Sequence, residues 1–515
     1  MKSTPLSLVA GVVALAAVTG FAALNAPGDA ATTEAKAASR LPVERSSLLC
    51  PAPSNSDLAS TAYTSFTPAG KGEGEAGEAE LKPATALDPD EATEPAPKKD
   101  EKDKKDEKGE KAGAKADKPV VALKEPGKPV GAETTESDAP ALVGTATGRL
   151  APGWTAQQTT TVTAGDSRGL LGASCSGPDT DFWFPGASTA KARQDYVHLT
   201  NPDDSAAVAD IELYGPDGPL KAEVGEGITV PAHSSVPMLI STLTSEAVED
   251  VTVHVTTRTG RIGALIRAAD GTAGSDWLPS SVDPAGTVVL PGIPADATSV
   301  QLVAFAPGED DADVKVQMMG KNATFSPAGN DTLHIKSNMT ASVDLRNVTR
   351  GEPGSLRLTP VESDRATPIV AALRVVRGTG ADREIAFIPA TGPVGARASV
   401  ADNRAKGSVL SLTAPGATAE VKVTASAGTE GGEQVVKTYT VKGGTTLAVT
   451  PPVPSGLKGS YALTVEPESG GPVHAARTLV LPEGGIEMFT VQTLADDGGT
   501  VEVPRAEQDL SLLDD

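Results

Sequence analysis

Short runs in which apolar and polar residues alternate follow one another along most of the chain beyond residue 140. Alternation over four to eight residues is typical of a β-strand with one buried face. Val, Thr, Ala, Gly and Pro are abundant, and aromatic residues make up only 3% of the sequence. The pattern therefore predicts an all-β protein with many short strands and small cores. Its 515 residues exceed the size of one ordinary domain.

One strand pattern repeats three times. The stretches YVHLTNPDDSAAVADIELYG, SVQLVAFAPGEDDADVKVQMMG and SVLSLTAPGATAEVKVTASAG each contain an apolar run, a proline, a turn and an alternating strand. Their prolines, Pro202, Pro307 and Pro415, are spaced 105 and 108 residues apart. A period near 105 residues with about seven short strands predicts tandem immunoglobulin-like β-sandwich modules. A propeller-like or continuous β arrangement is the alternative, although propeller blades usually repeat every 20–50 residues.

The repeats also end alike, on a strand with a central pair of small residues. These pairs are Gly263-Ala264, Ala371-Ala372 and Ala475-Ala476, and GLLGASC places Gly172-Ala173 in the same column. Small residues at one strand position indicate close approach of another backbone or sheet. The earlier pair predicts a fourth, N-terminal module whose first strand is RSSLLCPAP, from Arg45 to Pro53.

A charged tract interrupts this first module. Residues 70–140 centre on KKDEKDKKDEKGEKAGAKADK and contain few apolar residues. Such a segment cannot offset the entropy lost on ordering, so we expect a disordered insertion within a surface loop. The predicted modules span residues 44–185, 186–279, 280–389 and 390–515, the last with its tail, after a tether at 25–43.

The N-terminus carries the clearest targeting signal. After Lys2, the segment from Leu6 to Leu24 contains 19 residues without a charge. This length matches a membrane-spanning helix, whereas a signal-peptide core is usually shorter. We therefore expect residues 1–24 to be either an N-terminal membrane anchor or a cleaved signal peptide. In both cases the remaining chain is extracytoplasmic, membrane-anchored or secreted.

Aromatic, apolar and proline residues form triplets near the module junctions. The triplets are Trp183-Phe184-Pro185, Trp277-Leu278-Pro279 and Phe387-Ile388-Pro389. A recurring triplet at each junction indicates a seam between modules. A ligand platform is the alternative interpretation.

The chain has two cysteines, Cys50 and Cys175. We expect them to form a disulfide, because the chain is exported and they end the first and closing strands of one module. Two buried free thiols, or pairing between molecules, are the rival interpretations.

Candidate chemistry is sparse. No nucleotide loop, His-Glu-x-x-His or Gly-x-Ser-x-Gly motif occurs in the sequence. His198, His254 and His334 lie between apolar neighbours and are expected to point outward from their strands. The acidic turns NPDDS and GEDDAD are interpreted as solvated turns, with calcium binding as the alternative. The sequence thus predicts no catalytic residue, cofactor or metal ligand.

Several stretches resemble a family of actinobacterial secreted proteins known as a domain of unknown function. They are the Cys-Pro opening, FWFPGAS, DYVHLTNPDDSAAVADIELYG, VVLPGIPADATSV and FIPATGPVGARASVADN. The resemblance covers roughly Val43 to the C-terminus. It implies export by a Gram-positive cell and a location in the envelope, but no activity, cofactor or catalytic residue.

The sequence favours a non-enzymatic cell-envelope protein that acts as a scaffold or recognition surface. An array of wall-polymer-binding modules and an envelope hydrolase without a recognisable motif are the alternatives. The partner would be an envelope protein or polymer, and the membrane if the N-terminal helix is retained. A net charge of -23 argues against nucleic acid as a partner.

Overall fold

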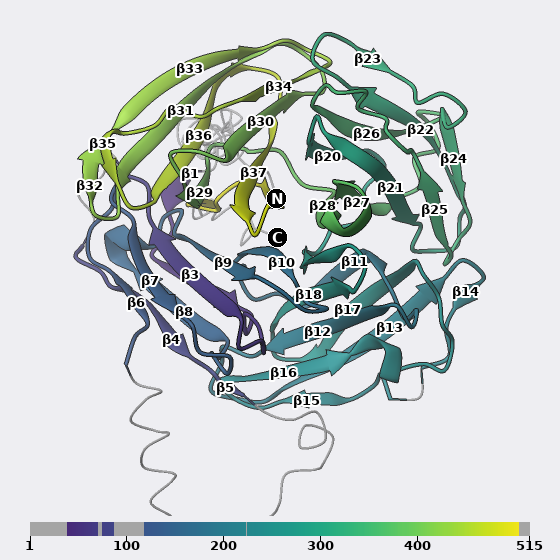
Figure 1. Cartoon of the computed structure of the whole chain (residues 1–515), viewed down its shortest axis with the longest axis horizontal. Helices are drawn as coiled ribbons and strands as arrows, with labels where there is room; N and C mark the ends of the chain where they lie inside the picture. The colour runs from purple at the N-terminus through teal and green to yellow at the C-terminus, as the bar shows by residue number, and fades with distance from the viewer. Residues whose placement is uncertain (1–38, 71–74, 87–117, 223, 504–515) are drawn as a thin grey trace, which may run out of the picture. The chain divides into compact units, whose positions relative to one another are not determined.

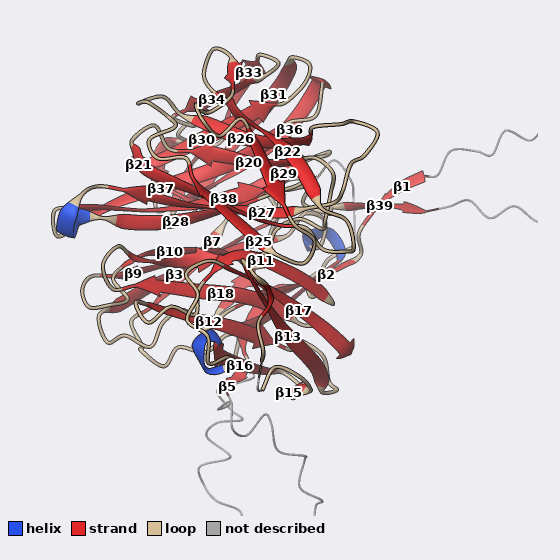
Figure 2. Ribbon diagram, turned by 90° about the vertical axis from the view of Figure 1, so that its right-hand side faces the viewer, coloured by secondary structure: helices blue, strands red, loops and turns tan. Residues whose placement is uncertain are grey.

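The computed structural model describes residues 39–70, 75–86, 118–222 and 224–503. Strands account for nearly all its regular structure (Figure 2), so the all-β prediction is confirmed. The described helical segments are three short 3-10 turns: η1 (Gly148–Leu150), η2 (Ile240–Thr242) and η3 (Gly380–Asp382). None of the helices in these ranges has the length and apolar character needed to cross a membrane. The predicted apolar helix at 6–24 lies outside the described residues.

Residues 42–499 form one compact unit. Eight of its sheets combine in pairs, and each pair surrounds an apolar core. We call these pairs modules 1 to 4. A separate small unit contains the pairing of β1 (Ser39–Pro42) with β39 (Thr500–Val503).

The first two modules contain the following strands. In module 1, one sheet has β2 (Arg45–Cys50), β8 (Leu142–Thr147), β4 (Ala79–Pro83) and β6 (Val121–Leu123), and the other has β10 (Gly169–Ser174), β9 (Thr155–Val162), β3 (Ala59–Phe66) and β7 (Val130–Thr134). In module 2, one sheet has β11 (Asp181–Ala187), β17 (Val251–Thr259), β13 (Ala207–Gly215), β14 (Gly218–Pro219) and β15 (Ile228–Val230). Its other sheet has β19 (Gly274–Leu278), β18 (Gly263–Asp270), β12 (Arg193–Thr200), β16 (Ser234–Leu239) and β5 (Thr85–Ala86).

Modules 3 and 4 repeat this plan. In module 3, one sheet has β20 (Val288–Ile293), β26 (Gly354–Pro360), β22 (Ala312–Met319), β23 (Thr324–Phe325) and β24 (Thr332–Ile335), and the other has β25 (Thr340–Asp344), β21 (Ala297–Phe305), β27 (Val370–Arg377) and β28 (Glu384–Pro389). In module 4, one sheet has β29 (Ala398–Asn403), β36 (Tyr461–Gly470), β31 (Ala419–Gly428), β32 (Gly431–Glu433), β35 (Ser455–Lys458) and β33 (Val435–Val441). Its other sheet has β34 (Thr445–Val449), β30 (Ser408–Ala414), β37 (His474–Glu483) and β38 (Ile486–Leu494).

The last strand of each module joins the modules into a circuit. Strand β19 packs against β10 and β28, and β38 packs against β28 and β10. Figure 1 shows the modules following one another around these inner strands, from β3 through β12 and β21 to β30. Module 4 therefore contacts module 1, which a linear row of modules would not allow.

The predicted disorder of residues 70–140 is wrong for the described parts of that range. Strands β4, β5, β6 and β7 lie within it. Leu81, Val121 and Leu123 are buried in the core of module 1. These short apolar segments flank the charged tract. The charged residues of the tract dominate the average composition of residues 70–140, and this average was the basis of the prediction. The charged centre, residues 87–117, lies outside the described residues.

The predicted equivalence of the repeat ends also needs correction. Gly172-Ala173 lies in β10, an inner strand like β19, whereas Gly263-Ala264 lies in β18. Trp183 lies in β11, which pairs with β17 of module 2, so the predicted boundary at residue 185 falls inside a strand of that module. Alternation has the same period in every strand, so it cannot distinguish the opening from the closing strand of a module.

A bulge in the opening strand is the repeated feature that the sequence pattern did not predict. The strand register shifts within β11, β20 and β29. Gly186, Gly292 and Asp402 lie within these irregularities with φ of 99°, 89° and 56°. Positive φ favours glycine, which explains the shared Pro-Gly of β11 and β20. Module 4 instead places a buried aspartate in this strained conformation.

Candidate functional site

The residues predicted to form module seams have their aromatic faces covered. The Trp183 ring stacks on His254, with 3.6 Å between ring centroids, and lies 5.4 Å from Phe305 of module 3. Trp277 packs with module 1 residues that include Ala59 and Leu171. These tryptophans lie between modules and offer no open aromatic platform.

The other predicted seam residues divide between cores and junctions. Phe387 packs with the core of module 2, and the Arg193 guanidinium lies 5.8 Å from its ring centroid. Phe184 and Leu278 belong to the core of module 2, and Ile388 belongs to that of module 3. Of the three prolines, Pro185 and Pro389 are buried and Pro279 is half-buried.

The expected disulfide is present between Cys50 and Cys175. Their Cα atoms are 4.5 Å apart, and Cys50 is completely buried. The bond joins the end of β2, the opening strand of module 1, to the residue that follows β10. A backbone bridge between Leu49 and Ser176 runs beside it, with N–H···O distances of 2.8 and 3.2 Å.

A polar groove of about 570 Å³ runs between modules 1 and 2. The sheet of β2, β4 and β8 supplies one side, and loops of module 2 supply the other. Strand β5 joins the two modules by pairing in parallel with Ser234 and Ser235 of β16. The charged and titratable lining residues are Arg45, Glu78, Glu80, Lys82, Asp203, Asp204 and His233.

Ion pairs fix the module 2 wall of this groove. Arg261 donates to Asp203 through Nε (3.1 Å) and Nη2 (3.0 Å), and this hydrogen bonding lowers the pKa of the Asp203 carboxyl. His233 Nε2 lies 2.7 Å from Asp204 Oδ1. On the opposite wall, Lys82 Nζ lies 3.1 Å from Glu80 Oε2. The groove therefore presents both signs of charge in half-exposed and exposed positions.

His233 adopts a strained backbone conformation at the groove, with φ of 53°. Its carbonyl accepts a hydrogen bond from Thr85 N–H (2.8 Å), and its N–H donates to the Asp203 carbonyl (3.3 Å). A non-glycine residue with positive φ persists only where its surroundings over-determine it, and such residues cluster at functional sites. Backbone contacts from β5, the strand that follows β4 of module 1, and from Asp203 of module 2 thus hold residue 233 at the groove.

The predicted acidic turn NPDDS, residues 201–205, forms part of the same wall. The buried Asn201 side chain donates to the carbonyls of Ser205 (2.8 Å) and Val230 (2.9 Å) and accepts from Asp203 N–H (3.0 Å). The turn is thus held rigidly. Among the described residues, no group of three or more His, Cys, Asp or Glu side chains is arranged to hold a metal ion.

The expectation that the strand histidines point outward is wrong for His198. This side chain is buried against Trp277, with 5.1 Å between ring centroids. Burial, together with the charge of Arg267, lowers the pKa of His198 to about 3. Both faces of β12 are covered in the assembled unit, so alternation could not identify a solvent side. His334 is exposed, and His254 lies between Asp181 and Glu212.

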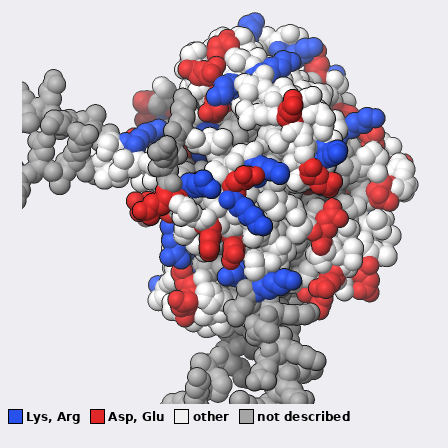
Figure 3. All heavy atoms as spheres, turned by 90° about the vertical axis from the view of Figure 1, so that its left-hand side faces the viewer, with Lys and Arg blue, Asp and Glu red and all other residues white. Residues whose placement is uncertain are grey.

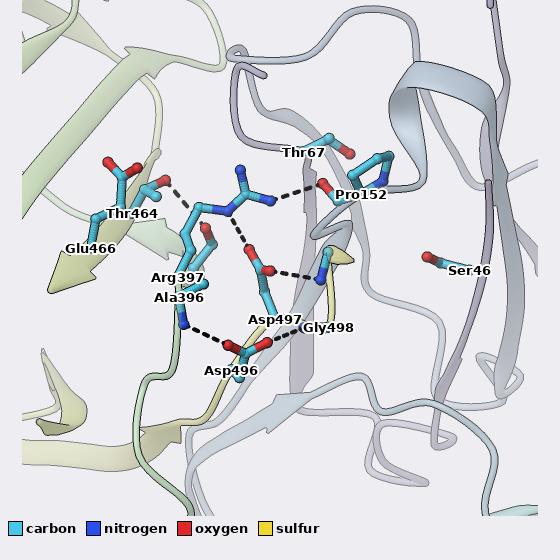
Figure 4. A network of polar contacts seen from close by, with 12 residues as sticks. Ser46, Thr67, Pro152, Ala396, Arg397, Thr464, Glu466, Asp496, Asp497 and Gly498 are labelled. Atoms are coloured by element: carbon cyan, nitrogen blue, oxygen red, sulfur yellow. Dashed lines mark hydrogen bonds and ion pairs between the residues drawn. The ribbon is translucent and has the colours of Figure 1, made fainter. Parts of the chain in front are cut away.

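A polar clasp joins modules 1 and 4 (Figure 4). Arg397 donates to Asp497 Oδ2 (2.5 Å) through Nε and to the Pro152 carbonyl (3.2 Å) through Nη2. Asp496 accepts from the backbone N–H groups of Ala396 and Gly498, each at 2.8 Å. The clasp draws the end of module 4 and the loop preceding β9 together, and it thereby helps to close the circuit.

Arg168 crosses from module 1 to module 3. Its guanidinium donates to Glu384 Oε1 (2.9 Å), to the Ala381 carbonyl (3.1 Å) and to the Arg383 carbonyl (2.7 Å). Burial raises the pKa of Glu384 from 4.5 to about 7, although Arg168 acts in the opposite direction. The carboxyl therefore holds a proton more tightly in the folded protein than in the unfolded chain.

This pKa shift predicts that the free energies of unfolding of the wild type and of Glu384→Gln differ by an amount that depends on pH. Between pH 4.5 and 7 the folded state retains a proton that the unfolded state has released. The contribution of Glu384 to unfolding free energy must therefore fall as the pH rises through that window. Urea unfolding from pH 4.5 to 8 should show the wild type losing stability relative to Glu384→Gln up to about pH 7. A constant difference would contradict the prediction.

Comparison with known proteins identifies the family. Residues 130–452 match the model of a family of unknown function, DUF5719. The chain belongs to this family. No curated protein matches. Among solved structures, a crystal structure of tripeptidyl peptidase 2 (TPP II) is similar with 11% identity and a TM-score of 0.15, covering 65% of this chain and 37% of that protein. The chain thus spans little more than a third of that peptidase.

Proposed function

We propose that this chain is a non-enzymatic, extracytoplasmic cell-envelope protein in which four immunoglobulin-like modules hold a recognition groove. The groove between modules 1 and 2 carries the proposal. It presents Arg45 and Lys82 opposite Asp203 and Asp204, and backbone contacts from Thr85 of β5 and from Asp203 fix its strained His233. A pre-organised polar groove suits a ligand that also carries both signs of charge, because little entropy is lost on binding.

Two charged pairs outside the groove support a scaffold role. The Arg168–Glu384 pair and the Arg397–Asp497 clasp both link different modules. On the face seen in Figure 3, basic and acidic side chains are interspersed, without a region of one sign. We therefore favour a local contact at the groove over broad electrostatic attraction. The disulfide supports an extracytoplasmic location, since such bonds persist in oxidising compartments.

A wall polymer bearing amino and carboxyl groups is the ligand class that we favour, with an envelope protein as the second candidate. We expect wild-type protein to sediment with purified actinobacterial cell wall. The double variant Arg45→Glu/Lys82→Glu should bind about tenfold to a hundredfold more weakly, because a hydrogen bond to a charged group contributes about 1.5–3 kcal/mol.

The matched control is Lys422→Glu, in a half-exposed pair with Glu466 (2.7 Å) on module 4 and away from the groove. It should bind the wall like the wild type. Equal binding by all three proteins would eliminate the groove as the contact site. Release of soluble wall fragments by the wild type would instead favour the envelope-hydrolase alternative.

A further inference from the structure

The edge strand of module 4 is longer than its counterparts in modules 2 and 3. Strand β33 pairs with β31 in the same way that β15 pairs with β13 and β24 pairs with β22. β15 has three residues and β24 has four, whereas β33 has seven. Figure 1 shows β33 at the outer rim of module 4. Module 4 thus presents an extended strand at a place where modules 2 and 3 keep the strand short.

The outer edge of β33 has no strand beside it. Among the described residues, β31 is the only strand that pairs with β33, and no loop forms a backbone hydrogen bond with residues 435–441. Val436, Lys437, Thr438 and Thr440 are exposed. The backbone N–H and C=O groups that point away from β31 are therefore available to pair with another extended chain.

The features that usually protect an exposed edge are largely missing from β33. Proteins protect such edges with short strands, proline, bulges or charged side chains. β33 contains no proline, and its register with β31 does not shift. Its one charged residue is Lys437, whose Nζ lies 4.7 Å from the ring centroid of Tyr439 on the same strand. Valine, threonine and tyrosine make up the rest of the strand and favour extended structure, so this edge is suited to pairing.

The sequence of β33 fits a second copy of itself. A two-fold axis at Thr438 aligns all seven residues of two antiparallel strands and places the core-facing residues of both copies on one face of the joined sheet. Val435 then lies opposite the partner's Val441. Lys437 lies opposite the partner's Tyr439, whose ring attracts a cation. An axis at Lys437 would instead place two ammonium groups opposite each other, which disfavours that register.

We propose that two copies of this chain dimerise through antiparallel pairing of β33, which joins their module 4 sheets edge to edge. The paired segment is about 24 Å long, since an antiparallel strand rises about 3.4 Å per residue. This contact is smaller than a standard protein interface, so the dimer is weak and its population depends on protein concentration. The proposal is independent of the surface groove.

Cysteine substitutions test the register of this pairing. In Thr438→Cys the two introduced thiols face each other across the axis, with Cα atoms about 4.5–5.5 Å apart, a separation that a disulfide can span. Thr440→Cys is the matched control, because it is also an exposed threonine on the same face of β33 but lies opposite the partner's Val436. The full chain, with its native disulfide intact, is treated with a mild oxidant and separated on a non-reducing gel. We expect a covalent dimer of Thr438→Cys and a monomer of Thr440→Cys. No covalent dimer of Thr438→Cys, or equal amounts of dimer in both variants, would overturn the proposal.

Sedimentation velocity measures association without a new cross-link. The wild type should shift from monomer towards dimer as its concentration rises. Thr438→Glu should associate about tenfold more weakly, because two carboxylates would face each other across the axis. Within one chain the same glutamate lies opposite Lys422 of β31, which favours the native pairing of β33. Thr332→Glu, opposite Lys315 on the short edge of module 3, is the matched control and should associate like the wild type.

Two results of this measurement would contradict the proposal. One is a wild type that stays monomeric even at about 1 mM, a concentration at which weak complexes form. The other is equal association of the wild type and Thr438→Glu. If Thr438→Glu fails to fold, the two cysteine variants decide.

Discussion

A fragment restricted to residues 130–452, the segment that matches the family model, should fold in modules 2 and 3 but not in the truncated modules 1 and 4. The cut at 130 removes β2, β3, β4 and β6 from module 1, and the cut at 452 removes β35 to β38 from module 4. Module 1 loses half of its core residues, and module 4 loses a third. The fragment also loses β38, which packs against β10 and β28, and Cys50. Far-UV circular dichroism during urea unfolding should therefore show only the transition of modules 2 and 3, at a lower urea concentration than the transition of residues 42–499.

Residues 181–389 provide the control for this experiment. They retain every strand of module 3, and of module 2 they lack only β5. The fragment should unfold cooperatively but at a lower urea concentration than the full unit. It loses the partners of Trp277 in module 1 and the contact of Phe489 with the core of module 3. If residues 130–452 unfold at a clearly higher urea concentration than residues 181–389, the truncated modules 1 and 4 still fold and the prediction is wrong.

The sequence predicted those features that depend on local pattern. Alternation predicted the strands, and the spacing of Pro202, Pro307 and Pro415 revealed three of the four modules. The disulfide was predicted because Cys50 and Cys175 end the first and the closing strand of module 1. Contacts between modules could not be predicted in this way. The groove combines residues from Arg45 to Thr147 with others near position 203, and only the tertiary fold brings these segments together.

The errors share a physical cause. A strand in an isolated sandwich has one core face and one solvent face, and this assumption made His198 an outward residue. In the assembled unit, module 1 covers the second face of β12, and His198 is buried. The column of small residues was also aligned one position out of register in module 2, because strand pairing places Ala264, and not Gly263, in the column of Ala371 and Ala475.

Replacing both cysteines with alanine should lower the free energy of unfolding by about 4–5 kcal/mol, since the bond closes a loop of 125 residues. This value comes from the entropy that the cross-link removes from the unfolded chain. The backbone bridge between Leu49 and Ser176 remains available, so the folded structure should be little changed. Urea unfolding of wild type and Cys50→Ala/Cys175→Ala gives the difference, and far-UV circular dichroism verifies that both are folded in buffer.

Reduced wild type is the matched control, because it keeps both sulfur atoms and lacks only the bond. It should unfold at nearly the same urea concentration as the alanine variant, while the oxidised protein unfolds later. If oxidised wild type, reduced wild type and the alanine variant all unfold at the same urea concentration, module 1 does not limit the stability of the four-module unit. If the alanine variant is much less stable than reduced wild type, the packing of the buried Cys50 side chain contributes most of the effect. The comparison therefore separates a restriction of the unfolded chain from contacts made in the folded one.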